Sequence, residues 1–224
     1  MLRMAKDFKI TRESILSGAL EAHLEQSERM GLVELSSQKE RALSRQEAIE
    51  QFVPGEDIWL FAYGSLLWNP TIHFKETRHG LLRGYHRRFC LKTVLGRGSP
   101  ENPGLMLALD HGGSCHGIAY RIDRTIADKE LKIVWDREMI SSAYVARVLP
   151  LMTDLGTLNA ITFVINRSNK QYAGKLSPEI IAAVIASSDG PLGSCTDYLF
   201  QTIEKMMELK INDKTLLQLS ELVK

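Results

Sequence analysis

The 224-residue sequence predicts an α+β fold in which a mostly antiparallel or mixed sheet curls around a pocket. Three observations support this prediction. Residues 57–165 contain six short apolar or β-branched runs that are typical of strands. The chain shows no regular alternation of strands and helices and no repeat period, so a doubly wound sheet is not indicated. Its length allows one large domain with an appendage.

The first part of the chain is helix-forming and rich in Glu, Gln, Ser and Arg. Thr11 can cap a helix whose apolar residues recur at helical spacing through residue 24. Ser37 and Glu40 form a capping-box pattern that begins a second helix. We therefore expect a helical N-terminal extension, residues 1–55, in front of a domain that spans residues 56–224.

The strands expected in that domain share short apolar runs bounded by turn residues: 58–63, 80–93, 105–109, 117–122, 144–151 and 157–165. Thr125 and Asp128 can cap a helix between the fourth and fifth of these strands. After the last strand, Ser177 followed by proline and glutamate predicts a helix that runs to residue 187. Residues 197–211 predict another helix.

Composition excludes several classes of protein. The 28 Lys and Arg residues nearly balance 27 Asp and Glu, which argues against a nucleic-acid partner. The longest apolar run, 180–186, is too short to span a membrane, and charged residues near the N-terminus argue against a secretory signal. The three cysteines are odd in number and widely spaced, as expected for reduced thiols. The sequence therefore predicts a cytoplasmic protein.

The most unusual segment is an apolar strand that stops at Tyr63-Gly64-Ser65. Glycine lets the chain turn and approach a ligand closely, and such a turn can leave backbone N–H groups pointing into a cavity. A nest of this kind suits a carboxylate. The alternative is a core strand followed by an ordinary turn.

Glu138 lies near the C-terminal end of the helix that precedes the fifth strand. The unpaired carbonyl groups of a helix C-terminus raise the pKa of a nearby carboxyl group, as a general base working near neutral pH requires. The alternative is a solvated glutamate paired with Arg137.

Two other motifs carry weaker hypotheses. Cys115 sits at the centre of a nucleophile-elbow spacing beside His116, but the residues that follow predict a strand where an elbow requires a helix. The segment 96–99 begins like a dinucleotide fingerprint, but prolines replace the expected helix, so it is interpreted as a loop at a pocket rim.

The six histidines form no metal-binding array. We expect neither a metal nor a cofactor.

Several segments together resemble the ChaC family of glutathione-specific γ-glutamylcyclotransferases, in the order and approximate spacing of that family. They are Tyr63-Gly64-Ser65-Leu66-Leu67-Trp68-Asn69-Pro70, Gly84-Tyr85-His86-Arg87-Arg88-Phe89, Pro103-Gly104-Leu105-Met106-Leu107-Ala108-Leu109, Gly117-Ile118-Ala119-Tyr120-Arg121, Arg137-Glu138-Met139 and Gly190-Pro191-Leu192-Gly193. The resemblance covers residues 57–205 and leaves the first 55 residues and about the last 15 unexplained.

The resemblance implies a small mixed β-barrel with flanking helices and a pocket at one end. It implies that Glu138 is the single catalytic residue and that the substrate is glutathione. The substrate-binding residues that it implies are Tyr63, Gly64, Ser65, Leu66, Arg87, Tyr144 and Tyr198. One departure is Cys195, where the family often has asparagine, and this affects one wall of the pocket.

Physical chemistry explains how such a reaction proceeds without a metal or a covalent enzyme intermediate. In a γ-glutamyl amide the α-amine can attack the γ-carbonyl, close a five-membered lactam and expel the other amine. Holding the substrate folded gives an effective molarity on the order of 10⁵ M or more. One carboxylate with a raised pKa can take a proton from the α-ammonium and return one to the leaving nitrogen. Backbone N–H groups can bind the substrate carboxylate or the developing oxyanion.

Three functions are therefore considered. The first is a cyclotransferase that converts glutathione to 5-oxoproline and cysteinylglycine through Glu138. The second is a non-catalytic regulatory or binding module, similar to a cation-transport regulator, whose helical extension docks a partner. The third is a thiol hydrolase that uses Cys115. The sequence leaves the oligomeric state and the choice among γ-glutamyl substrates open.

Overall fold

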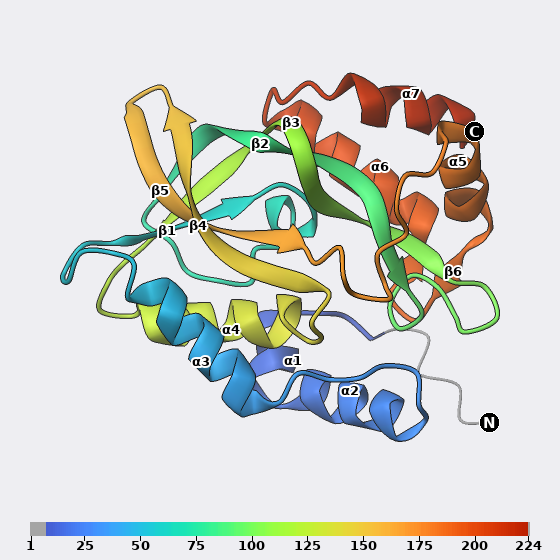
Figure 1. Ribbon diagram of the computed structural model, residues 1–224, viewed down its shortest axis with the longest axis horizontal. Helices are drawn as coiled ribbons and strands as arrows, with labels where there is room; N and C mark the ends of the chain where they lie inside the picture. The colour runs from blue at the N-terminus through green and yellow to red at the C-terminus, as the bar shows by residue number, and fades with distance from the viewer. Residues whose placement is uncertain (1–7, 224) are drawn as a thin grey trace.

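A computed structural model describes residues 8–223, and its centre is a closed barrel of five strands (Figure 1). The strands are β1 (Ile58–Ala62), β2 (Glu76–Thr93), β3 (Gly104–Ile122), β4 (Tyr144–Thr153) and β5 (Gly156–Ile165). They follow the order β1-β3-β2-β4-β5, and a parallel pairing of Leu60 with Ile161 closes the barrel. A short hairpin, β6 (Asp189–Gly190) and β7 (Gly193–Ser194), lies outside it. The expected mixed sheet curled on itself is confirmed.

The longest feature of the barrel is the antiparallel hairpin of β2 and β3. The prediction of separate strands over 105–109 and 117–122 was wrong, because β3 continues through the intervening glycines. Gly112 and Gly113 have φ values of 99° and 67°, and they lie opposite Gly84 of β2 where the register shifts. Two residues facing one form a bulge that bends the strand without ending its pairing.

The helices of the described residues are α1 (Arg12–Leu16), α2 (Ala19–Arg29), α3 (Gln38–Ile49), α4 (Ala127–Glu138), α5 (Pro178–Ser187), α6 (Cys195–Glu208) and α7 (Lys214–Leu222), with one 3₁₀ turn, η1 (Ser65–Leu67). The predicted caps Thr11, Ser37 and Ser177 each accept a hydrogen bond from a backbone N–H of the first turn and are confirmed. The first predicted helix is divided at Gly18, whose φ of 77° interrupts it. None of the helices in the described part of the chain is long and apolar enough to cross a membrane.

The cap predicted for α4 was wrong. The helix begins at Ala127, and neither Thr125 nor Asp128 caps it. Instead, the Thr125 hydroxyl donates to a carboxylate oxygen of Asp123 at 2.6 Å, so a local turn uses the expected capping group. The sequence also did not predict α7, which Asp213 caps by accepting a bond from the N–H of Leu216.

Two hydrophobic layers explain how α4 is positioned. Alternate side chains of β1 enter different layers, because successive residues of a strand face opposite sides. Phe61 packs inside the barrel with residues from the other four strands, whereas Leu60 faces the helices. Trp135 of α4 is fully buried and meets the ring of Phe163 of β5 edge-on at 5.1 Å. This contact lays α4 along the β1–β5 side of the barrel.

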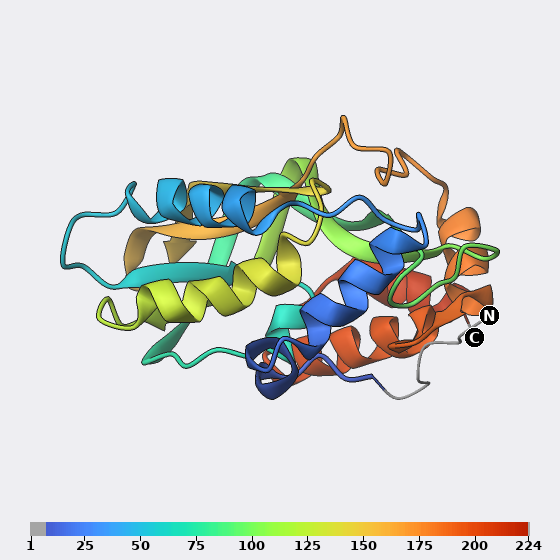
Figure 2. The ribbon, with the colours of Figure 1, turned by 90° about the horizontal axis from the view of Figure 1, so that it is seen from below.

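The N-terminal extension packs on the same side (Figure 2), where α1 and α3 contact α4. Arg12 binds the carboxylate of Glu130 on α4, with 2.7 Å between Nη2 and Oε1, and it also donates to the carbonyl of Thr71. Asn69 donates to the carbonyl of Ile10 at 2.8 Å. The extension therefore rests against both α4 and the segment that follows η1.

Replacing Arg12 tests this attachment. Glu130 is only 2% exposed, so Arg12→Ala leaves a buried carboxylate without its guanidinium partner. We expect the free energy of unfolding to fall by about 1–3 kcal/mol. Arg45→Ala is the matched control, because its partner Asp128 is 71% exposed and a surface pair contributes about 0–1 kcal/mol. Urea unfolding should show a larger loss of unfolding free energy in Arg12→Ala than in Arg45→Ala. Equal losses in the two variants would contradict the prediction.

Candidate active site

The candidate site begins where β1 ends. The Tyr63 hydroxyl is buried and donates to the carbonyl of Phe163 at 2.9 Å. Gly64 then leads into the 3₁₀ turn η1, which closes when the N–H of Leu67 donates to the carbonyl of Gly64 at 2.9 Å. The first N–H groups of a helical turn have no partner within the turn, so those of Ser65 and Leu66 are available as donors.

Arg137 connects this turn to α4. Its Nη2 donates to Oγ of Ser65 at 2.8 Å, and its Nη1 donates to the carbonyl of Asn69. Its Nε lies 2.9 Å from Oε1 of Glu138. The guanidinium is 5% exposed, and its planar set of donors suits three partners at once. Arg137 thus positions the turn and the carboxylate relative to each other.

Glu138 is the last residue of α4, and 15% of its side chain is exposed. Burial raises the pKa of its carboxyl group above the ordinary glutamate value, while Arg137 acts in the opposite direction. The expected direction of the pKa shift is confirmed, but its main cause is burial rather than the helix carbonyl groups. The pairing with Arg137 exists as well, although it is buried rather than solvated.

The charge of Glu138 acts on three buried tyrosine hydroxyls: those of Tyr63, Tyr144 and Tyr198. Burial is the main cause of the raised pKa of each hydroxyl, and the charge of Glu138 adds to it. Tyr144 also donates to the carbonyl of Leu107 at 3.0 Å. All three hydroxyls are protonated near neutral pH, and those of Tyr63 and Tyr144 donate their protons to the carbonyls of Phe163 and Leu107.

Tyr198 reaches the turn from α6. A Cβ placed on Gly64 would lie 3.1 Å from the Tyr198 hydroxyl, closer than such contacts normally are. The absence of a side chain at Gly64 therefore lets Tyr198 approach the backbone of the turn. The structure thus brings together the predicted residues Tyr63, Gly64, Ser65 and Tyr198.

Two predicted binding residues hold the turn from within the protein. Arg87 is buried and donates from Nη1 to the carbonyl of Tyr63 at 2.6 Å, and its Nε pairs with Asp213 at 2.8 Å. These contacts favour a positioning role for Arg87 over direct contact with a substrate. Leu66 is 5% exposed, and its carbonyl accepts a bond from the Tyr120 hydroxyl at 3.0 Å.

The anchoring roles of Arg137 and Tyr120 were not predicted from the sequence. Arg137 was considered only as a solvated partner of Glu138, and the adjacent pair of charges was its only signal. The thiol-hydrolase hypothesis was wrong, because Cys115 is buried inside β3 and burial raises the pKa of its thiol. All three cysteines are free and buried. Within residues 8–223, no three His, Cys, Asp or Glu side chains form a group able to hold a metal ion.

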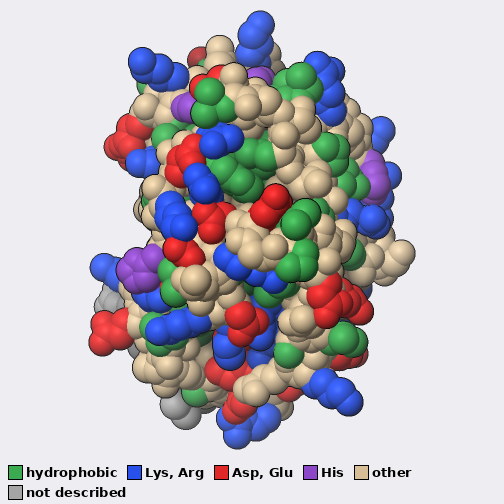
Figure 3. Space-filling view, turned by 90° about the vertical axis from the view of Figure 1, so that its left-hand side faces the viewer, with side chains coloured by type: hydrophobic (Ala, Val, Ile, Leu, Met, Phe, Trp, Pro, Cys, Tyr) green, Lys and Arg blue, Asp and Glu red, His purple; other side chains and the backbone are tan. Residues whose placement is uncertain are grey.

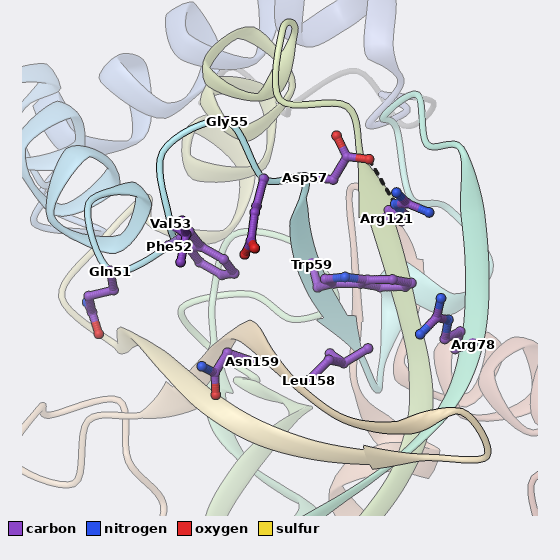
Figure 4. A pocket seen from close by; sticks show the side chains of 11 residues that line it. Gln51, Phe52, Val53, Gly55, Asp57, Trp59, Arg78, Arg121, Leu158 and Asn159 are labelled. Carbon is purple, nitrogen blue, oxygen red and sulfur yellow. Dashed lines mark hydrogen bonds and ion pairs between the residues drawn. The ribbon is translucent and has the colours of Figure 1, made fainter.

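A cavity of about 560 Å³ is lined by other residues. Its lining comes from the segment after α3 and from four barrel strands: Gln51, Phe52, Val53, Gly55, Glu56, Asp57, Trp59, Arg78, Arg121, Leu158 and Asn159 (Figure 4). The guanidinium of Arg78 stacks on Trp59 at 4.6 Å, and Arg121 pairs with Asp57 at 2.8 Å. Acidic and basic side chains are mixed on the left-hand side of the molecule as oriented in Figure 1 (Figure 3). None of the predicted site residues lines this cavity.

Comparison with known proteins identifies the family. The family model described as "ChaC-like protein" matches residues 58–224, which include the turn and Glu138. The chain belongs to this family. The match begins at β1, so it leaves the helices α1–α3 outside.

Individual relatives of this ChaC-like chain agree with the family match. A glutathione-specific gamma-glutamylcyclotransferase from Escherichia coli (strain K12) is 41% identical over 157 residues, which cover 70% of this chain and 68% of that protein. Glutathione-specific gamma-glutamylcyclotransferase 1 from Homo sapiens is 32% identical over 154 residues, 66% of this chain and 69% of that protein.

A solved structure supports the fold of the ChaC-like chain. It is the crystal structure of a selenomethionine-labelled gamma-glutamyl cyclotransferase specific to glutathione from yeast, with a TM-score of 0.69 and 21% identity. The match covers 75% of this chain and 96% of that chain. The expected barrel type is confirmed.

The contact between Gly64 and Tyr198 gives a prediction that needs no substrate. Gly64→Ala places a methyl group 3.1 Å from the Tyr198 hydroxyl, so we expect a loss of about 1–3 kcal/mol in the free energy of unfolding. Tyr198→Phe removes that hydroxyl, so the same change should cost less in the Tyr198→Phe background. A double-mutant cycle of urea unfolding measures the difference. Additive losses would show that the two residues do not constrain each other.

Proposed function

We propose that this ChaC-like protein converts glutathione to 5-oxoproline and cysteinylglycine, with Glu138 as the acid–base group. The observation that carries the proposal is the Glu138 carboxyl group, whose pKa burial raises and which Arg137 links to Ser65 of the turn. A carboxylate with a raised pKa is suited to accept and return a proton near neutral pH.

The relatives support enzymatic activity. The bacterial and animal proteins reported above are named as glutathione-specific gamma-glutamylcyclotransferases, and the chain spans about two thirds of their length. The chain is accordingly an enzyme of this class, a lyase that degrades glutathione. This assignment favours the cyclotransferase over a purely regulatory or binding module.

The proposed reaction begins with the γ-glutamyl group folded in the site. The free N–H groups of Ser65 and Leu66 bind the α-carboxylate or the oxyanion that develops on the γ-carbonyl. Glu138 removes a proton from the α-ammonium, and the freed amine attacks the γ-carbonyl carbon. The bond to the cysteinyl nitrogen breaks as Glu138 returns a proton to that nitrogen. The attacking nitrogen then gives its second proton to the Glu138 carboxylate, and this proton passes to the departing amine, which leaves 5-oxoproline and cysteinylglycine with Glu138 ionised again.

Arg137 affects the pH range over which Glu138 can act as a base in this mechanism. Its guanidinium lowers the pKa of the carboxyl group, which burial has raised. The ion pair therefore keeps a useful fraction of Glu138 ionised in an environment that disfavours the charge. The Tyr198 hydroxyl can donate to an oxygen of the bound substrate, whereas the hydroxyls of Tyr63 and Tyr144 already donate to backbone carbonyls.

Glu138→Gln tests the central role. The amide keeps the shape of the side chain but cannot accept the proton, so turnover should fall by roughly 10² to 10⁴ while glutathione binding changes little. Release of 5-oxoproline measures turnover, and calorimetry measures binding. The matched control is Asp136→Asn on the same helix, where the aspartate pairs with the exposed Lys132. Near-normal turnover in Glu138→Gln would end the assignment.

A second prediction concerns pH. The base must be ionised, so the rate should rise with pH through a midpoint above 4.5, the ordinary glutamate value. Arg137→Met removes the group that lowers the pKa of Glu138, so the acid limb should move to higher pH. Profiles of kcat against pH check the shift. An unmoved acid limb in Arg137→Met would mean that another group controls it.

A further inference from the structure

The last helix of the chain begins at a residue that also supports the candidate active site. Asp213 is the N-cap of α7, and its Oδ1 accepts a hydrogen bond from the N–H of Leu216 at 3.1 Å. Oδ2 of the same carboxylate accepts a hydrogen bond from Nε of Arg87 on β2 at 2.8 Å. One side chain therefore begins a helix and pairs with a cation of the barrel.

Arg87 connects this carboxylate to the backbone of the turn. Its Nη1 donates to the carbonyl of Tyr63 at 2.6 Å, and its Nη2 donates to the carbonyl of His116 on β3. Tyr63 is the residue before Gly64, and the peptide unit that joins them is planar, so a fixed Tyr63 carbonyl also fixes the N–H of Gly64. The three donor nitrogens of Arg87 thus link the start of the turn to β3 and to α7.

The position of the Arg87 side chain depends on Asp213. The Arg87 side chain is only 1% exposed, and among residues 8–223 Asp213 is the one carboxylate within ion-pair distance of it. Removing one partner of a buried ion pair leaves an uncompensated charge, which is strongly unfavourable. Without Asp213 the guanidinium would move toward water, and the Tyr63 carbonyl would lose its donor.

The helix that carries Asp213 is itself held in place. Leu216 and Leu219 of α7 are buried, and the helix packs on α5 and α6 (Figure 1). Tyr198 lies on α6, and its hydroxyl is 3.1 Å from the place where a Cβ on Gly64 would lie. The two C-terminal helices therefore reach the turn by two routes, α6 directly and α7 through the ion pair of Asp213.

We propose that Asp213 is a positioning residue for the reaction, which holds Arg87 and so keeps the turn and its free N–H groups in the geometry that the transition state requires. This inference rests on the proposed function. Asp213 acts through Arg87 rather than on the substrate. A displacement of about 1 Å in groups that bind the reacting atoms can lower a rate by on the order of 10²-fold. The last helix then contributes to turnover as well as to stability.

Asp213→Ser tests the proposal, because serine keeps the helix cap but does not pair with Arg87. We expect kcat/KM for glutathione, measured by release of 5-oxoproline, to fall about 10- to 100-fold. Asp213→Glu should recover part of this loss, because it restores a carboxylate although glutamate is not a preferred cap. The matched control is Leu219→Ala, which removes buried atoms from α7, keeps the ion pair and should leave kcat/KM nearly unchanged. Circular dichroism shows whether each variant is folded under the assay conditions.

Two further measurements examine the link itself. In an Arg87→Met background, Asp213→Ser should cause little further loss of kcat/KM, because the link is already broken. The second measurement needs no substrate. Amide hydrogen exchange in residues 63–67 should be about tenfold faster in Asp213→Ser than in the unmodified protein, and it should be unchanged in Leu219→Ala.

Three results would overturn the inference. Unchanged kcat/KM in a folded Asp213→Ser protein would show that the turn does not depend on the ion pair. Equal losses in Asp213→Ser and Leu219→Ala would assign the effect to the stability of α7. Additive losses in the double variant would show that Asp213 and Arg87 act separately. Failure of the proposed function looks different, because the unmodified protein would form no 5-oxoproline. Unchanged exchange in the turn of Asp213→Ser would overturn the inference in that case too.

Discussion

The candidate site depends on one buried guanidinium. Arg137 binds the side chain of Ser65, the backbone of Asn69 and the carboxylate of Glu138, although Ser65 and Arg137 are 72 residues apart. The turn at the end of β1 and the last residue of α4 are far apart in the sequence, so only non-covalent contacts hold them together. Because the guanidinium is rigid and planar, it fixes both the distance and the orientation between them. The proposed base and the proposed oxyanion donors therefore keep a constant geometry.

Burial gives several side chains of this region their chemical character. Removal from water raises the pKa values of Glu138, Tyr63, Tyr144 and Tyr198 and lowers the pKa of Arg97. In each case the charged form is the one that water would have stabilised. The hydrophobic packing of α4 and α6 on the barrel thus has a chemical consequence, because it creates the environment in which these groups work.

Local signals predicted much of the fold from the sequence. The helix caps at Thr11, Ser37 and Ser177 depend on a few neighbouring residues and were predicted correctly. Errors arose where a distant or competing partner decided the outcome. Thr125, the expected cap of α4, donates its hydroxyl to Asp123 instead. The strand β3 continues past two glycines, which in the sequence resemble a turn, because it pairs with β2 on both sides of them.

The candidate site shows the same difference between local signals, which the sequence reveals, and distant partners, which it does not. Sequence motifs indicated the Tyr63-Gly64-Ser65 turn and Glu138, because each lies in an unusual local segment. Sequence patterns do not show which side chains face each other across the fold. The contacts of Arg137 with Ser65 and Glu138, and of Arg87 with the carbonyl of Tyr63, were therefore not predicted. The direction of the Glu138 pKa was predicted for the wrong reason, since burial depends on packing that spacing does not specify.

The attachment of the N-terminal helices has a consequence for biosynthesis. Arg12 and its partner Glu130 are 118 residues apart, so the first helix leaves the ribosome long before its docking surface exists. At 5–20 residues per second, the delay is roughly 6 to 24 s. During that interval the apolar face of α1 lacks its native contacts with α4, although α1 and α2 can already contact each other. The nascent chain therefore exposes this face of α1, and binding by chaperones or premature association competes with its docking on α4.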